Sequence, residues 1–398
     1  MSVQYNNHES NCTVCDSPRI TEFLVIVGVL VHCNLLWPTR KEAIRAPKGD
    51  LRLGFCQRCG HIFNLAFDPE LITYTQTYEN SLHFSPRFHS YAESLANRLI
   101  KQYDFYGKDI IEIGSGQGDF LRLLCQLGGN RGVGFDPSYV PEQEAILAED
   151  RVTIIRDFYS DRYADYEADL ICSRHVLEHI QFPQSFLASI RRSIGDHSHS
   201  LVFFEVPNVM FTLRDLGIWD LIYEHCSYFS RNSLAHLFNT QGFEVINQTE
   251  VYEGQFLCIE SLPREGLHSP KFENGHDLEQ MNSHVATFAD KYRERVAEWE
   301  NNLEDFVAAG QRVVLWGGGS KGVTFLNTLK IQDQVEYVVD INPRKHGKYV
   351  AGTGQQIVPP EHLQDYQPDV VIVMNPIYYN EIKQNLIKLG ISAQLLLL

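Results

Sequence analysis

The 398-residue chain has little of several features that define other classes of protein. Its longest apolar run, residues 23–31, falls well short of the ~20 residues of a membrane-spanning helix and contains Gly28. The N-terminus MSVQYNNHES shows no charged segment followed by an apolar one, so we expect no signal peptide and a cytoplasmic location. Lys and Arg number 34 against 50 Asp and Glu, and the net charge of −16 argues against binding to nucleic acid or a membrane surface.

A disulfide framework is also missing. The chain has nine cysteines, an odd number scattered over its whole length. It shows no short repeat and no low-complexity tract. With 44% hydrophobic and 21% charged residues the composition is that of an ordinary globular protein, and the length predicts two or three domains.

Four of the cysteines form two close pairs. Cys12 and Cys15 lie in NCTVC, and Cys56 and Cys59 lie in FCQRCGH. Two such pairs are typical of a four-thiolate zinc site, and Gly60 suits the tight turn after the second pair. Since four thiolates complete a tetrahedral shell, we expect a structural Zn2+ ion. Redox dithiols are the alternative, but neither pair opens a helix after a strand.

We predict an α/β protein of three modules. Residues 1–75 form a zinc-binding domain, residues 76–262 alternate strands with helices, and residues 263–398 contain a linker helix and a smaller Rossmann-like domain. The linker helix is expected over 276–309, where apolar residues recur at spacings of three and four before Gly310 ends the pattern. This apolar stripe is expected to pack between domains. It consists of Met281, Val285, Phe288, Tyr292, Val296, Trp299, Leu303 and Phe306.

The segment KDIIEIGSGQGDFLRLL reads as a strand, a glycine loop and a helix. Glycines let a backbone approach a ligand closely. A nicotinamide fingerprint would need a sixth-position glycine, where this chain has Asp119. The G-x-G-x-G spacing, with Glu112 before it, instead resembles the S-adenosylmethionine (SAM) loop of class I methyltransferases, and this resemblance implies that the loop binds SAM. Its candidate cofactor-binding residues are Glu112, Gly114, Ser115, Gly116 and Gly118.

The strands that follow support this interpretation. Asp136 ends the second strand, where an acid can bind a ribose diol. Asp157 and Phe158 end the third strand, DLICSRHVLEHI contains the fourth, and LVFFEVPNV is the fifth. This order resembles the class I methyltransferase fold, in which the position of Asp157 and Phe158 contacts the adenine. A doubly wound domain for another nucleotide is the alternative.

A second strand, glycine loop and helix lie in RVVLWGGGSKGVTFLNTL. Lys321 does not stand where a Walker A lysine would. Backbone amides of a loop at the start of a helix can bind an anion, and Lys321 adds positive charge, so we expect a diphosphate as the ligand. A purely structural loop is the alternative.

The combination of a four-cysteine module, a class I domain and a second Rossmann-like domain resembles the C-methyltransferases of nucleotide-linked 4-keto-deoxysugars. TYEN at 77–80, HVLEHI at 175–180, YEH at 223–225 and VVDINPRKHGKYVAGT after the second loop carry the resemblance. It implies that His225 is the base that makes an enolate, with Glu224 orienting it or binding a sugar hydroxyl. His179 and Tyr78 would stabilise the enolate or hold the sugar. Further substrate contacts are predicted at Tyr223, Asn208 and Lys321, in a monomer or homodimer acting in deoxysugar biosynthesis.

Two features depart from the family pattern and leave the acceptor open. The family has a tyrosine two places before the glutamate, where this chain has Ile222, and the strand after YEH reads YEGQFLCIE. His175 is interpreted as structural or adjacent to the cofactor. The alternatives are an O- or N-methyltransferase with another small acceptor, an NAD-dependent oxidoreductase using residues 317–319, and a non-catalytic SAM-binding scaffold.

Overall fold

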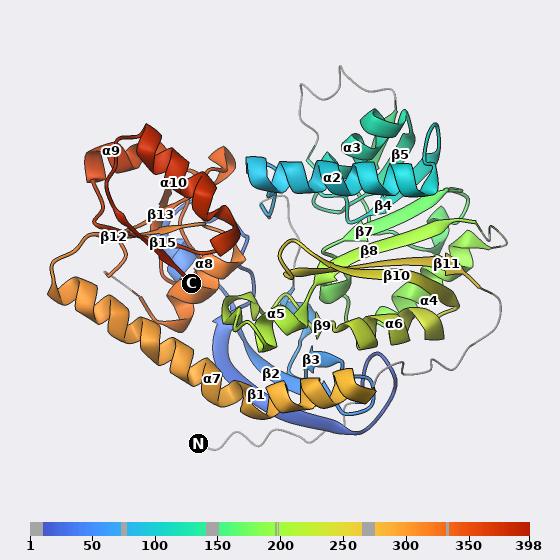
Figure 1. The fold of residues 1–398 in the computed structure, drawn as a ribbon, viewed down its shortest axis with the longest axis horizontal. Helices are drawn as coiled ribbons and strands as arrows, with labels where there is room; N and C mark the ends of the chain where they lie inside the picture. Colours follow the sequence, from blue (N-terminus) through green and yellow to red (C-terminus); the bar gives the residue numbers. More distant parts are fainter. Residues whose placement is uncertain are drawn as a thin grey trace.

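The structure is a computed structural model that describes residues 11–72, 78–140, 151–195, 197, 199–264, 275–331 and 334–398. Its strands form three sheets of four, seven and five strands, which follow one another along the chain (Figure 1). The first sheet is antiparallel, the second is mixed and the third is parallel, and helices pack against the second and third sheets. The α/β fold class is therefore confirmed.

The first sheet is antiparallel and has the order β1-β2-β3-β9. Its strands are β1 (Ile20–Leu30), β2 (Lys48–Cys56), β3 (Ile62–Asn64) and β9 (Ser227–Tyr228), with the short helices α1 (Arg40–Ile44) and η1 (Pro69–Leu71) beside them. Because β9 comes from the central part of the chain, it joins the N-terminal module to the segment that contains His225.

The central sheet has the order β10-β11-β8-β7-β4-β5-β6. The five strands β4 to β8 are parallel, and β11 adds antiparallel to β8, which is the topology of class I methyltransferases. Helices α2 and α3 cover one face, and α4 and α6 cover the other (Figure 1). The strands are β4 (Asp109–Ile113), β5 (Arg131–Phe135), β6 (Val152–Ile155), β7 (Leu170–Arg174), β8 (Leu201–Pro207), β10 (Phe243–Val251) and β11 (Phe256–Pro263). The helices are α2 (Pro86–Tyr103), α3 (Asp119–Gly128), α4 (Pro183–Ile194), α5 (Val209–Leu213) and α6 (Arg231–Thr240).

The C-terminal sheet is parallel throughout, with the order β14-β13-β12-β15-β16. Its two central strands, VVLW and VVIV, are wholly buried, as expected where helices cover both faces of a parallel sheet. The strands are β12 (Val313–Trp316), β13 (Tyr337–Val339), β14 (Gln356–Val358), β15 (Val370–Val373) and β16 (Gln394–Leu397). The helices are α8 (Ser320–Thr328), α9 (Leu363–Tyr366) and α10 (Tyr379–Lys388).

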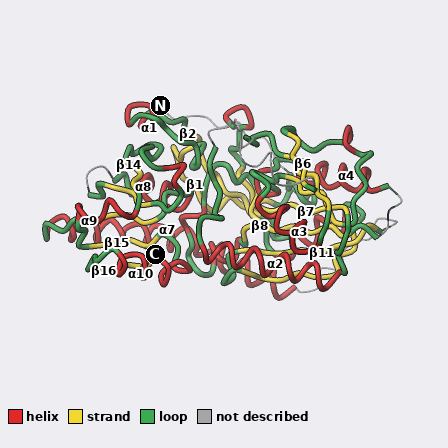
Figure 2. Tube along the Cα trace, turned by 90° about the horizontal axis from the view of Figure 1, so that it is seen from above, coloured by secondary structure: helices red, strands yellow, loops and turns green. Residues whose placement is uncertain are grey.

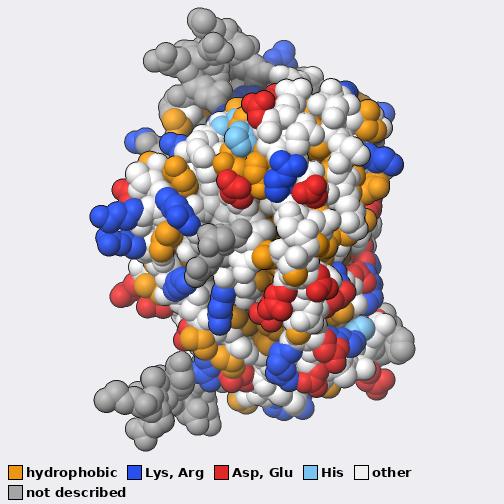
Figure 3. All heavy atoms as spheres, turned by 90° about the vertical axis from the view of Figure 1, so that its left-hand side faces the viewer, with side chains coloured by type: hydrophobic (Ala, Val, Ile, Leu, Met, Phe, Trp, Pro, Cys, Tyr) orange, Lys and Arg blue, Asp and Glu red, His pale blue; other side chains and the backbone are white. Residues whose placement is uncertain are grey.

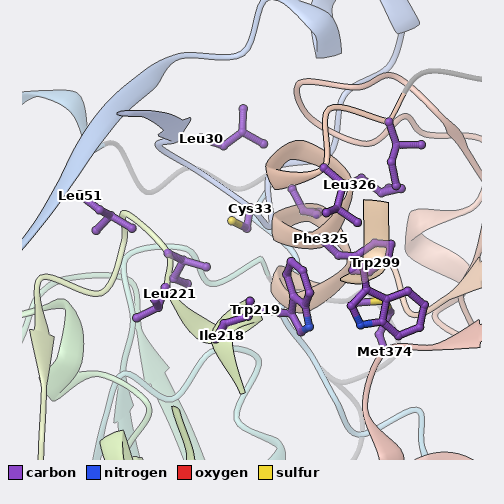
Figure 4. Packing of buried hydrophobic residues seen from close by; sticks show 14 of the residues in the cluster. Leu30, Cys33, Leu51, Ile218, Trp219, Leu221, Trp299, Phe325, Leu326 and Met374 are labelled. Atoms are coloured by element: carbon purple, nitrogen blue, oxygen red, sulfur yellow. The ribbon is translucent and has the colours of Figure 1, made fainter. Parts of the chain in front are cut away.

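Helix α7 (Gly275–Ala308) is the predicted linker helix, and it runs from beneath β1 to the C-terminal domain (Figure 1). Its Met281, Phe288 and Trp299 belong to one buried cluster that draws residues from all three modules. Figure 4 shows part of this cluster, in which Trp219 and Trp299 both pack edge-on against Phe325. The three modules therefore share a core and hold fixed positions around the space between them.

From above, the central and C-terminal domains lie side by side, with β1 and β2 near their junction (Figure 2). On the outer face of the C-terminal domain, basic and acidic side chains are intermixed (Figure 3). Within the described ranges no helix has the length and apolarity needed to cross a membrane.

Candidate functional site

A cavity of about 290 Å3 lies where the three modules meet. The N-terminal module supplies Asn34, and Tyr78 comes from the segment before α2. The central domain supplies the ends of β7, β8 and β11 and the turn before β9, while the C-terminal domain supplies its glycine loop and the ends of β13 and β15. The cavity thus lies at the carboxyl ends of parallel strands, where α/β sheets bind their ligands.

His225 lines this cavity, and its ring lies 4.9 Å from that of His179, which lines the same wall. Burial, together with the positive charge of neighbouring histidines and of Lys321, holds the pKa of His225 well below its ordinary value. His225 is therefore a neutral imidazole at pH 7. His179 Nδ1 lies 2.9 Å from the backbone carbonyl oxygen of Glu224, and because that oxygen can only accept, Nδ1–H donates a hydrogen bond to it.

Glu224 does not reach the cavity. Its side chain is fully buried, and Oε2 accepts a hydrogen bond of 2.9 Å from the backbone N–H of Cys33, while Oε1 lies 3.4 Å from Nδ1 of His32. The carboxylate therefore ties the His225 turn to the N-terminal module. This contact differs from the predicted one to His225 or a sugar hydroxyl, and it fixes the position of His225 through the backbone.

Two predicted substrate contacts also lie away from the cavity. Tyr223 is buried, its ring packs on Phe67, and its hydroxyl accepts a hydrogen bond of 2.8 Å from the N–H of Asp68. Asn208 is the N-cap of α5, with Oδ1 accepting from Met210 N and Nδ2 donating to the carbonyl of Gly254. The structure gives both side chains packing and capping roles. Ile222, rather than Tyr223, lines the cavity.

Tyr78 and Lys321 do line the cavity. Tyr78 pairs with Leu35 in an isolated antiparallel bridge, which brings the segment before α2 onto the N-terminal module. The Lys321 ammonium forms a salt bridge with Asp220. Because Lys321 lies in the first turn of α8, it combines its charge with the positive end of the helix dipole.

The first glycine loop connects β4 to α3, and Gly114, Gly116 and Gly118 all have positive φ, as that loop requires. Asp136 Oδ2 accepts a 2.8 Å hydrogen bond from Gly116 N, and Oδ1 accepts one of 2.8 Å from Ser138 N. Ser115 Oγ is buried and has no hydrogen-bond partner within the described residues. An open glycine turn, an acid beside it and an unsatisfied hydroxyl fit a ligand such as SAM.

The other predicted cofactor residues differ in exposure. Glu112 is buried beneath the loop, and burial raises its pKa to about 8, so it is largely protonated at pH 7. Asp157 accepts a hydrogen bond from the Tyr163 hydroxyl and pairs with Arg162. Phe158 is 64% exposed, which leaves its ring available to a planar ligand beside β6.

The four paired cysteines come together as the sequence predicts. Their sulfur atoms all lie within 4.8 Å of one another, with Cys12 and Cys59 at 3.6 Å and Cys15 and Cys56 at 3.5 Å. Four thiolates about 2.3 Å from a tetrahedral zinc ion would lie roughly 3.8 Å apart, so the arrangement fits such an ion. Gly60 has a φ of 74°, the conformation expected after the second pair.

Two protein families match this chain. Residues 85–248 match the family described as "Methyltransferase domain", and residues 270–391 match the family described as "C-methyltransferase C-terminal domain". The C-methyltransferase NovU of Streptomyces niveus is 27% identical over 295 residues, covering 70% of this chain and 69% of NovU. The chain is a SAM-dependent C-methyltransferase.

Among solved structures, the pyocyanin biosynthetic protein PhzM is 16% identical, with a TM-score of 0.35, over 42% of this chain and 54% of PhzM. The match thus spans about half of PhzM. The magnesium protoporphyrin IX methyltransferase ChlM of Synechocystis PCC 6803, with bound SAH, is 14% identical, with a TM-score of 0.36, over 44% of this chain and 84% of ChlM. Likeness at this level carries no argument about the acceptor.

The C-methyltransferase has cavity residues that sequence reasoning did not assign. Tyr252, Gln255 and Phe256 come from the YEGQF segment that departs from the family pattern, and its glutamine amide exchanges two hydrogen bonds with the amide of Asn375. Asn375 lies two residues after the end of β15, so its place beyond a strand end was a usable signal. His175 also lines the cavity.

Proposed function

We propose that this C-methyltransferase transfers a methyl group from SAM to the carbon beside a ketone in a nucleotide-linked keto-deoxysugar, through an enolate formed by His225. The observation that carries the proposal is the neutral imidazole of His225 in the wall of a cavity that the C-terminal glycine loop also lines.

The need for a base follows from the reaction class. A carbon next to a ketone becomes a nucleophile only after it loses a proton, whereas an amine needs little activation. The imidazole of His225 accepts this proton, and the electron pair of the C–H bond becomes that of the enolate. Bound SAM would supply the electrophilic methyl group: its S–CH3 bond breaks as the C–C bond forms, and the electron pair of the broken bond stays on the sulfur of S-adenosylhomocysteine (SAH).

The C-terminal wall suits the anionic part of such a substrate. Lys321 and Lys345 both line the cavity, beside the loop Gly317–Gly319 that precedes α8. Each ammonium lies against a carboxylate, Lys321 against Asp220 and Lys345 3.3 Å from Asp340. A diphosphate would share these cations and the loop amides, which is the usual recognition of phosphate at a helix start.

The middle of the cavity suits a deoxygenated ring. Tyr252 and Phe256 stack with ring centroids 5.0 Å apart, and Ile222, Trp316 and Met374 also line the cavity. Apolar walls favour a sugar that has lost a hydroxyl group and carries a methyl group. The cavity of about 290 Å3 at the junction of three domains is close to the lower limit of ligand pockets, which usually enclose about 300–1,000 Å3.

Hydrogen–deuterium exchange tests the proposal. Wild-type protein with SAH in D2O is incubated with a panel of nucleotide-linked 4-keto-deoxysugars, and proton NMR follows the protons beside the ketone. One such signal should disappear faster than without enzyme, and His225→Asn should abolish the effect while calorimetry shows unchanged SAH affinity. Exchange at the wild-type rate in His225→Asn would remove His225 as the base, and no exchange with any ketone would contradict the proposed reaction.

A further inference from the structure

We propose that His175 is a further catalytic residue: an imidazolium, held in the cavity wall by Glu178 and Glu205, that stabilises the oxygen of the acceptor as the enolate forms. This inference rests on the proposed function, since it assigns a role in the same proton removal.

The backbone places His175 at the boundary between the two halves of the site. It follows the last residue of β7 and has a φ of 55°, a left-handed conformation that is uncommon outside glycine. The next residue, Val176, packs against the SAM loop so closely that a Cβ on Gly114 would lie 2.1 Å from its Cγ2. Unusual backbone conformations of this kind concentrate at functional sites. His175 thus stands between the SAM loop and the acceptor cavity that it lines.

Two buried carboxylates hold the ring. Nε2 lies 2.9 Å from Oε1 of Glu205, and Nδ1 lies 3.7 Å from Oε1 of Glu178. Both glutamates are almost fully buried, whereas the His175 side chain is 26% exposed. The ring is therefore anchored on the protein side and partly exposed on the cavity side. Phe256 also packs edge-on against it, with the two ring centroids 4.5 Å apart.

Neither contact uses the ring N–H groups fully. Nε2 has no aligned hydrogen-bond partner within the described residues despite its closeness to Glu205, and 3.7 Å is too long for a hydrogen bond from Nδ1. Oε2 of Glu178 is likewise buried without a hydrogen-bond partner in the described chain. The ion pairs keep the ring charged. Since Nε2 is buried against Glu205, the ring group that remains for a ligand oxygen is Nδ1–H.

The charges around the ring favour the imidazolium. Burial alone lowers the pKa of His175, but Glu178 and Glu205 outweigh it and raise the pKa to about 9. Arg174 and the Tyr91 hydroxyl bind Glu205 and keep it ionised, with its pKa lowered to about 2 even though burial acts in the opposite direction. His175 in turn helps to lower the pKa of His225. The neutral imidazole of His225 is thus suited to act as the base, and the charged imidazole of His175 is suited to stabilise negative charge on the acceptor.

Each proton and electron pair of the reaction has a defined place when His175 has this role. His225 takes the proton from carbon, the C–H electron pair moves into the enolate, and the negative charge that collects on the ketone oxygen faces the His175 cation. When the enolate carbon takes the methyl group, the carbonyl re-forms and His175 retains its own proton. No further co-reactant is needed.

The variant His175→Asn removes the charge while asparagine still tolerates the left-handed backbone. Loss of one oxyanion-stabilising group lowers rates by about 10²-fold, and we expect α-proton exchange to fall by that amount with SAH affinity within threefold of wild type. The pH profile of kcat/KM should change in two ways. Its acid limb moves to higher pH because His225 loses a positive neighbour, and its alkaline limb near pH 9 disappears. His197→Asn is the matched control, since His197 is an exposed histidine paired with Glu167, and it should leave the profile unchanged.

A second variant and a direct titration cover the case in which His175→Asn loses SAH binding. Glu178→Gln removes one carboxylate, so the alkaline limb should move to lower pH. The imidazole NMR signal that is present in wild type and missing from His175→Asn should titrate above pH 8. A signal that titrates at or below pH 6.5, exchange in His175→Asn within threefold of wild type, or unmoved limbs in both variants would overturn the inference. Absence of exchange in the wild-type enzyme would instead contradict the proposed function, and this role with it.

Discussion

The Asp136 carboxylate organises the first glycine loop, and its removal tests the SAM site. One oxygen accepts from Gly116 N at 2.8 Å, and the other accepts from Ser138 N at 2.8 Å and from the Ser138 hydroxyl at 2.6 Å. These three bonds leave one lone-pair site of the carboxylate, on Oδ2, for a hydroxyl of the ribose diol. Asp136→Ala should therefore weaken SAM binding by two routes, through loss of the diol contact and through loss of loop order.

The magnitude follows from the diol contact alone. A hydrogen bond to a charged group contributes about 1.5–3 kcal/mol. At about 1.4 kcal/mol for each tenfold in affinity, the Kd for SAM should rise roughly 10- to 150-fold. Loop disorder would add to this effect.

The C-terminal domain offers a matched control. Asp340 repeats the arrangement, with Oδ2 accepting from Gly318 N at 2.9 Å and Oδ1 accepting from Asn342 N at 2.8 Å. Calorimetric titration with SAM should show the large loss in Asp136→Ala and wild-type affinity in Asp340→Ala. Affinity within twofold of wild type in Asp136→Ala, or an equal loss in both variants, would refute the assignment of the first loop.

Three further predictions concern stability. Metal analysis should find one zinc ion per chain in the wild type and less zinc in Cys59→Ser. Chelation should lower the Tm of the wild type, because the four buried cysteines then lose the ion that they share. A metal-free protein with an unchanged Tm would contradict the zinc site. Gly49→Ala should destabilise by about 1–3 kcal/mol, because a Cβ there would lie 2.4 Å from the Tyr223 ring, and an unchanged denaturation midpoint would argue against a packed Tyr223. The pKa of Glu112 is about 8 in the folded protein, above its unfolded value, so the free energy of unfolding of the wild type should fall as pH rises from about 4.5 to 8. Glu112→Gln should therefore be more stable than the wild type at pH 8 but not at pH 5. An equal difference in stability at both pH values would contradict this prediction.

The local patterns predicted the elements well. The strand Asp109–Ile113 is found as predicted, and the linker helix lies within one residue of its predicted ends. Both depend on short-range rules, since glycine permits the loop and apolar spacing of three and four makes the helix amphipathic. The four cysteines were predictable because a metal site leaves its spacing in the sequence.

The roles of side chains around His225 were harder to predict. Glu224 and His225 are neighbours in sequence, yet Glu224 binds Cys33 while His225 lines the cavity. Tyr223 likewise binds Asp68, more than 150 residues away. These contacts depend on the pairing of β9 with β3 of the N-terminal sheet. This pairing joins residues far apart in the sequence, so a local sequence pattern does not predict it. The contact of His175 with Glu205 is long-range in the same way, since Glu205 comes from the next parallel strand.

The position of the transferred methyl group tests the central claim most directly. The enzyme is given SAM labelled with 13C in its methyl group and the nucleotide-linked keto sugar that undergoes exchange, and the product is examined by 13C NMR. We predict a new methyl resonance with carbon–carbon correlations to the position beside the ketone. A label attached to oxygen or nitrogen, or a product from an acceptor without a ketone, would contradict it.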